Sequence, residues 1–419
     1  MSARRRWRQR AARETRPSPQ DFWRDLNLRI KSGQVIPIIS DSVRTERIFD
    51  LDFDYDLDLR TEDGSFHAPD MEAEDDDLHI SGKETGDGGG HSLDKDERDN
   101  DLHAASLNVE EELAEVWAER IGYPLVHDKH RLARVAVYNR VCCLDEEQAK
   151  TNYLRFLKTL LLEDAEEDGE VADLVPDLRE QQDSLSFSAI ASQLGYPKYA
   201  SADDDPLRLL ARLPLPIYIT TSFHDFMERA LADEKRPYRT QICFLKGPPM
   251  RLEPEHRPDP TYVPSPKKPV VYHLHGFEDY ASSLILSEDD YLDFLVRVSE
   301  EGKDSHEPLI PLYLTGALTE SSLMLLGYRL HDWDFRVVFR GLIKAKHVSL
   351  RKFGLAIQLD PAEQREIKDS EKAREYLETY FQPEKFIVDW GTTDRFVKGL
   401  YRRYNNWRGV SDEPEEPAD

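Results

Sequence analysis

Cysteine is scarce in this chain of 419 residues. Two of its three cysteines are adjacent, at Cys142 and Cys143. Three cysteines can form neither a disulfide framework nor a four-cysteine zinc site. We therefore expect a reduced, cytoplasmic compartment and no bound metal.

Positive charge is also in short supply, since 56 basic residues face 82 acidic ones, a net charge of −26. Phosphate backbones attract proteins with a surplus of lysine and arginine, so we expect no direct nucleic-acid binding. Long apolar runs are missing as well. Uncharged apolar stretches such as 213–221 fall far short of the roughly 20 residues that a membrane helix needs, so we expect no membrane association.

The negative charge is concentrated in one part of the chain. From Asp50 to Asp101 there are 20 acidic and 4 basic residues, with too little apolar content to form a core. We expect a disordered acidic insertion over 61–102 and a disordered acidic tail over 409–419. Residues 1–17 are rich in arginine and predict a flexible basic tail, although a transit peptide has a similar composition.

Between these segments, short apolar runs alternate with helical patterns. Runs such as VIPII at 35–39 are typical of strands buried on both faces. The expected strands are 35–39, 215–222, 240–245, 269–275, 322–328, 353–359 and 386–390. Six or seven such strands with helices between them predict an α/β fold with a doubly wound, mostly parallel sheet.

Helix-start signals divide the chain further. Ser18-Pro19, Asp205-Pro206 and Ser287 with Asp290 are typical of helix N-termini. Residues 107–200 read as helices without a strand, so we expect a helical insertion there. The main domain is expected to span 18–345, with an α/β part at 346–408 that completes the sheet.

In a doubly wound sheet, ligands bind beyond the carboxyl ends of the strands, where the strand order reverses. Polar residues and glycines follow the expected strands at four such places. They are Ser40, Asp41 and Ser42; Thr221, Ser222, His224 and Asp225; His275 and Gly276; and Gly327, Tyr328 and Asp332.

These four segments resemble the sirtuin-like NAD-binding domain of bacterial anti-phage defence proteins. TTSFHDFME at 220–228 is similar to its threonine-threonine-asparagine stretch, and VIPIIS occupies the place of its first strand and phosphate loop. VVYHLHG at 270–276 with SEDDY at 287–291 resembles its histidine-glycine strand end and later acidic helix start. LLGYRLHDWDFR at 325–336 resembles its glycine-tyrosine segment.

The resemblance implies a Rossmann-like fold with NAD as substrate or ligand. It implies that His275 acts as a base or ribose ligand and that Ser222 positions water or ribose. Residues expected to contact the dinucleotide are Ser40, Asp41, Ser42, Arg44, Thr221, His224, Asp225, Gly276, Gly327, Tyr328 and Asp332. Structural roles remain open too, because Ser222 could cap a helix that begins near His224.

The chain departs from the family at three points. It has Ile39-Ser40-Asp41-Ser42 where the family has glycine-alanine-glycine-x-serine, Ser222 where the family has asparagine, and His224 where the family has the following aspartate. Glycines there allow the backbone to approach a pyrophosphate closely, and Arg44 could offset the charge of Asp41. Two hypotheses follow: an NAD+ glycohydrolase of anti-phage defence, or a catalytically degenerate protein that binds NAD, ADP-ribose or a partner. Under either hypothesis, a homo-oligomer or a defence-partner protein is a candidate partner.

Overall fold

The computed structural model describes residues 19–41, 43, 48–49, 109–143, 145–246, 251–300, 309–328, 333–344, 354–358, 369–382 and 385–411. The chain divides into two units, one made of 1–50 and 108–419 and the other of 51–107. The second unit lies outside the described residues, and so do the predicted insertion 61–102 and the basic tail 1–17. The architecture below is that of the first unit.

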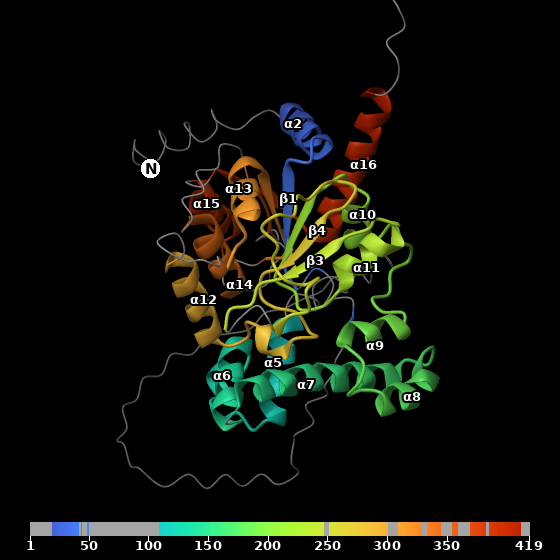
Figure 1. Ribbon diagram of the computed structural model, residues 1–419, viewed down its shortest axis with the longest axis vertical. Coiled ribbons are helices and arrows are strands. Elements are labelled where there is room, and N and C mark those ends of the chain that lie inside the picture. The colour runs from blue at the N-terminus through green and yellow to red at the C-terminus, as the bar shows by residue number, and fades with distance from the viewer. Residues whose placement is uncertain are drawn as a thin grey trace, which may run out of the picture. The chain divides into compact units, whose positions relative to one another are not determined.

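Seven strands form one sheet in the order β3-β4-β2-β1-β5-β6-β7, and every neighbouring pair is parallel (Figure 1). The strands are β1 (Val35–Ile39), β2 (Ile217–Thr220), β3 (Arg239–Ile242), β4 (Val270–His273), β5 (Ser322–Leu326), β6 (Gly354–Gln358) and β7 (Phe386–Trp390). Each coincides with a run predicted from the sequence. The predicted α/β fold with a parallel sheet is therefore confirmed.

β1 lies at the centre of the sheet, and its wholly apolar composition suits this position. All five residues of β1 are buried, and it pairs with β2 on one side and with β5 on the other. Parallel neighbours need long crossover connections, and the helices that provide them cover both faces of such a sheet. Because the chain passes from β1 to β2 and later returns to β5, the strand order reverses at β1.

Helices flank the sheet on both sides (Figure 1). One group is α2 (Pro19–Lys31), α10 (Pro206–Ala211), α11 (Phe226–Asp233) and α16 (Thr393–Ser411). The other is α12 (Glu288–Glu300), α13 (Leu312–Glu320), α14 (Trp333–Val337), which continues as a π-helix over Val338–Lys344, and α15 (Ser370–Phe381). The predicted tail 409–419 begins three residues too early, since α16 continues to Ser411. The Lys31 ammonium lies 5.4 Å from the Trp407 ring and packs this last part of the helix against α2.

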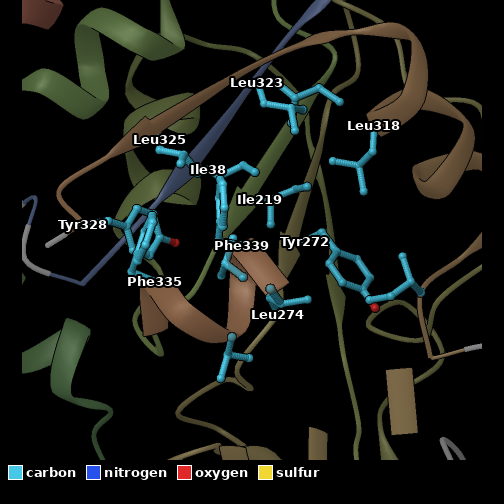
Figure 2. Packing of buried hydrophobic residues seen from close by; sticks show 14 of the residues in the cluster. Ile38, Ile219, Tyr272, Leu274, Leu318, Leu323, Leu325, Tyr328, Phe335 and Phe339 are labelled. Carbon is cyan, nitrogen blue, oxygen red and sulfur yellow. The ribbon is translucent and has the colours of Figure 1, made fainter. Parts of the chain in front are cut away.

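One hydrophobic core lies between the sheet and the second group of helices. Alternate residues of the central strands, among them Ile38, Ile219, Tyr272 and Leu325, point to the same side (Figure 2). Phe335 and other aromatic side chains of the facing helices cover them. Two-residue periodicity thus places one face of each strand in this core.

A helical insertion at the carboxyl end of the strands consists of α5 (Val109–Arg120), α6 (Leu132–Cys142), α7 (Glu146–Glu167), α8 (Val175–Glu180) and α9 (Phe187–Gln193) (Figure 1). All five helices lie within 107–200, the range that the sequence predicted to be helical. The sequence patterns did not predict α8, α9 or α13. The first two have only six and seven residues, too few for a clear period. Among the described helices, none is both long enough and apolar enough to cross a membrane.

Candidate functional site

The ends of β1 and β5 are joined where the strand order reverses. Ser40 donates its backbone N–H to Leu326 O at 3.0 Å and its hydroxyl to Gly327 O at 2.8 Å. Gly327 has a φ of +78°, in the region that favours glycine. The Ser40 hydroxyl, expected on a phosphate, therefore holds two strand ends together in this conformation.

The turn after β2 docks on the same place. Thr221 donates its N–H to Ile39 O at 2.9 Å, and its hydroxyl lies 3.1 Å from the hydroxyl of Tyr328. Thr221, Tyr328 and the end of β1 are thus brought together, as the sequence predicted for the carboxyl edge. Both side chains are buried.

Ser222 is buried, with 2% of its surface exposed. Its hydroxyl has no hydrogen-bond partner among the described residues. The following helix, α11, begins only at Phe226, with Asp225 preceding it. The hypothesis that Ser222 caps this helix is therefore wrong, because the chain makes a further turn first.

His224 lies inside the fold, with 5% of its surface exposed. Its Nε2 is 3.1 Å from Oδ1 of Asp41, and its ring centroid is 4.1 Å from that of Phe226. Asp41 stands where the family has a glycine, and His224 stands where the family has an acid. The carboxylate of Asp41 is therefore matched by the imidazole of His224.

These side chains surround a small cavity. Ser40, Thr220, Ser222 and His224 line it, and apolar side chains close the rest, namely Ile39, Val43, Leu207 and Met227. Its volume of about 10 Å³ accommodates at most one water molecule. Ligand sites usually need about 300–1,000 Å³. The cavity that the described residues form beside Ser222 is therefore too small for a dinucleotide.

Strand β4 ends at His273, and His275 follows it two residues later in different surroundings. His273 has no exposed surface; its Nδ1 donates to Ser222 O at 2.9 Å, and its Nε2 lies 2.8 Å from Oε1 of Glu228. Thr240 donates its hydroxyl to the same carboxylate oxygen at 2.9 Å. Because a carbonyl can only accept, Nδ1 carries one proton, and a second proton is shared with Glu228.

Burial alone would lower the pKa of His273, but the carboxylate of Glu228 raises it overall. Burial likewise favours the neutral form of Glu228, yet the imidazolium lowers the pKa of this carboxyl. We therefore assign a buried ion pair beneath the turn that carries Ser222.

His275, two residues later, is 3% exposed and lies among aromatic rings. Its ring meets those of Tyr291 and Phe294 edge-on, at centroid distances of 5.5 and 5.7 Å. Gly276 follows with a φ of +91°, and a Cβ there would lie 2.3 Å from Ser283 O. Only glycine fits this position without a backbone shift. His275 does not line the cavity beside Ser222.

The helical insertion reaches the site through Ser188, a residue that the sequence patterns did not single out. Its N–H donates to Oε2 of Glu278 at 3.2 Å, its hydroxyl contacts Oε1, and Asp225 N donates to that hydroxyl at 3.1 Å. Burial, together with the nearby Asp225 carboxylate, raises the pKa of Glu278 to about 7, although the hydrogen bonds from Ser188 act in the opposite direction. Glu278 was missed because nothing in its local sequence distinguishes a buried acid from a surface acid.

A larger cleft opens beside this contact. Its volume is about 810 Å³, and it lies between α7 and the loop 278–282. Charged groups of both signs line it, among them Arg155, Lys158, Glu278 and Asp279. It does not include His275 or Ser222.

Three of the predicted contacts, Ser42, Arg44 and Asp332, lie outside the described residues. Within the described ranges, no group of three or more histidine, cysteine, aspartate or glutamate side chains is placed to hold a metal ion.

Two comparisons with known proteins bear on this site. The family model of the SIR2-like domain matches residues 216–381, from β2 to α15. The protein named NAD(+) hydrolase ThsA from Cytobacillus dafuensis is 24% identical over 131 residues, which cover 31% of this chain and 22% of that relative. The matched stretch is thus about a fifth of the relative's length. The family match includes the turn after β2, His275-Gly276 and Gly327-Tyr328, but not β1 with Ser40.

Proposed function

Since residues 216–381 are a sirtuin-like domain by their match to the SIR2-like family, we propose that this protein is an NAD+ glycohydrolase that releases nicotinamide and ADP-ribose. The motif resemblance inferred from the sequence is confirmed over that span. A relative named as an NAD(+) hydrolase supports NAD as the substrate.

One observation carries the proposal. The Ser222 hydroxyl is buried at the carboxyl edge of the sheet, next to the strand-order reversal, without a hydrogen-bond partner among the described residues. A buried polar group normally has a partner, and an exception calls for an explanation. A water molecule or a ribose hydroxyl of the substrate would provide the missing bond.

The reaction requires few groups. Water attacks C1′ of the nicotinamide ribose, the new C–O bond forms, and the C1′–N bond breaks with its electron pair going to the nicotinamide nitrogen. The proton of the attacking water passes to a base, for which His275 is the candidate. Ser222 would orient the water or a ribose hydroxyl, and the buried surroundings would exclude bulk solvent.

Access is the main requirement that the described conformation does not meet. A cavity of about 10 Å³ beside Ser222 cannot hold a dinucleotide. The proposal therefore requires that NAD binds to a rearranged form in which Val43, Leu207 or Met227 has moved. Such a form would bind NAD with reduced apparent affinity, because part of the binding free energy opens the site.

A second function is favoured by the end of β1. A protein that binds a partner without turnover would tolerate the side chains of Ser40 and Asp41 where a phosphate loop needs glycines. The Asp41–His224 contact at 3.1 Å fills this position with groups of the protein itself.

A role in anti-phage defence is part of the first proposal, and it depends on the family resemblance. Such an effector would deplete cellular NAD on infection, and an oligomer or a defence partner would trigger it. Cells that express the protein should lose NAD after phage infection, and cells with His275→Ala should keep it. Unchanged NAD in infected wild-type cells would contradict this role.

The direct test is to incubate the purified full chain with NAD and to measure released nicotinamide by chromatography. We expect His275→Ala to reduce the rate about 100-fold or more, the usual contribution of a general base, and Ser222→Ala to reduce it less. His127→Ala is the matched control, since its side chain is 78% exposed. Equal rates for wild type and His275→Ala would remove His275 from the mechanism. No nicotinamide release from the wild type would support the second function.

A further inference from the structure

We infer that Lys150, on α7 of the helical insertion, is a positioning residue for His275. The physical coupling between the two residues is independent of the reaction, whereas its catalytic consequence rests on the proposed function. Lys150 lies 125 positions before His275 in the numbering, on a different part of the fold. It belongs to no motif that the sequence patterns singled out.

Lys150 is a buried cation. Only 4% of its surface is exposed, and its Nζ donates to Leu284 O at 2.6 Å. The same Nζ lies 3.3 Å from Oδ1 of Asp290 and 3.1 Å from Oε1 of Glu146. A lysine is seldom buried unless it is paired, so the carbonyl and the two carboxylates account for its position.

The Leu284 carbonyl belongs to the segment 283–285, whose hydrogen bonds hold His275 and the residues that follow it. The next residue, Ile285, donates its N–H to His275 O at 2.9 Å. Ser283 accepts a hydrogen bond from Phe277 N at 2.9 Å. A backbone shift at 283–285 would therefore move His275 directly.

Lys150 also acts on the ring of His275 through α12. Asp290 accepts hydrogen bonds from Ser287 N and Ser287 Oγ at 3.0 and 2.9 Å, and thereby fixes the start of this helix. Burial would raise the pKa of Asp290, but the nearby Lys150 and the Ser287 bonds hold it well below the usual range. The residue after Asp290 is Tyr291, and Phe294 lies one turn later; both contact the His275 ring.

Other cations hold the insertion to the same helix without reaching His275. Arg134 contacts Glu288 at 3.1 Å, and Arg140 pairs with Asp289 near the surface. The described contacts of Arg140 include none with 283–285. Lys246 contacts Asp290 at 3.1 Å and Glu146 at 2.8 Å, so it shares the carboxylates but not the Leu284 carbonyl. Lys150 thus contacts both segments that hold His275, the backbone at 283–285 and the start of α12.

The test compares Lys150→Met with Arg140→Met in the full chain. Each change removes one cation from the contact between the insertion and α12, but only the first removes the bond to Leu284. Hydrogen exchange of peptides that contain Ile285 is measured by mass spectrometry. We expect the Ile285 amide to exchange about 10-fold faster in Lys150→Met and at the wild-type rate in Arg140→Met.

NAD cleavage gives the second measurement. Lys150→Met should lower kcat about 10-fold with little change in KM, because His275 is misplaced rather than the substrate contacts removed. Lys150→Arg, which keeps a cationic donor, should recover part of kcat. If the wild type itself releases no nicotinamide, the proposed function fails while the exchange result still decides the coupling.

Removal of Lys150 leaves Asp290 with fewer charge partners and could unfold the chain. The double variant Lys150→Met/Asp290→Asn avoids this, because the asparagine oxygen still accepts from Ser287. It should fold, as judged by circular dichroism, and still show faster exchange at Ile285. Wild-type exchange at Ile285 in this folded double variant would overturn the inference, and so would equal exchange in Lys150→Met and Arg140→Met.

Discussion

The turn after β2 and the segment after β4 lie side by side at the carboxyl edge of the sheet, but they are held in different ways. The β2 turn, 221–225, is enclosed mainly by the sheet's own elements, with an ion pair beneath it and a cavity of about 10 Å³ beside it. The β4 segment, 275–290, is held by hydrogen bonds and ion pairs from the helical insertion. Residues that resemble one family's binding motifs can therefore depend on quite different supports.

This difference gives the insertion a specific place in the molecule. The contacts of α7 and α9 with Leu284, Asp290 and Glu278 fix the segment that carries His275. The turn with Ser222 depends mainly on β1, β4 and α11, and the insertion adds the hydrogen bond from Asp225 N to the Ser188 hydroxyl. We therefore expect changes in the insertion to affect His275 before they affect Ser222.

The largest effect is expected from the ion pair beneath the β2 turn. His273→Leu leaves the Glu228 carboxylate buried without its partner, and the free energy of unfolding should fall by about 4 kcal/mol. The double variant His273→Leu/Glu228→Leu should recover most of this loss. Chemical denaturation of both variants measures it, and an additive loss in the double variant would exclude a buried ion pair.

A smaller effect should come from the contact between the insertion and the β4 segment. The pKa of Glu278 is raised from 4.5 to about 7 in the folded protein, so folding takes up a proton. The stability that this proton provides is complete below pH 4.5 and is lost as the pH rises through 7. From pH 4.5 to above 7, wild type should therefore lose roughly 3 kcal/mol relative to Glu278→Gln.

Denaturation of wild type and Glu278→Gln at several pH values between 4.5 and 8.5 tests this difference. Glu255→Gln is the control, because Glu255 is an exposed acid without a contact to Ser188 among the described hydrogen bonds. Parallel stability curves for wild type and Glu278→Gln would show that Glu278 is ionised throughout.

Gly276→Ala should perturb the β4 segment without changing any charge. The new Cβ would lie 2.3 Å from Ser283 O, in a backbone conformation with a φ of +91°. We therefore expect the free energy of unfolding to fall by about 2 kcal/mol. Gly316→Ala is the matched control, since nothing lies within 4 Å of its Cβ position on α13. Gly316→Ala should raise the free energy of unfolding by about 1 kcal/mol, because alanine favours a helix more than glycine does. If Gly276→Ala and Gly316→Ala were equally stable, the backbone at 283–285 would be able to shift at little cost in free energy.

The smallest effect is expected in the sealed β2 turn. Ser222→Ala removes a buried hydroxyl that has no partner among the described residues, so the protein should gain about 1 kcal/mol of stability. The same change should weaken NAD cleavage if the hydroxyl serves the substrate. A variant that is less stable than wild type, by thermal unfolding, would indicate that the hydroxyl already has a bonding partner.

The sequence was informative wherever the signal was local. The seven apolar runs and the helix starts at Asp205-Pro206 and Ser287 were predicted, because burial on both faces and capping leave marks within a few residues. The helices α8 and α9 were not predicted, because they have too few residues to show a helical period. The closed cavity beside Ser222 was not predictable either, because Val43, Leu207 and Met227 come from three separate elements.

The sequence by itself determined the parallel sheet, the order of its elements along the chain and the set of polar residues at the strand ends. Only the tertiary structure decided which of these residues meet. Glu228 pairs with His273 across 45 positions, and Lys150 reaches Leu284 across 134. The physical reason is that a buried charge needs a partner, whereas a charge at the surface is solvated by water. Which partner it meets depends on how distant segments pack and not on the residues beside it in the sequence.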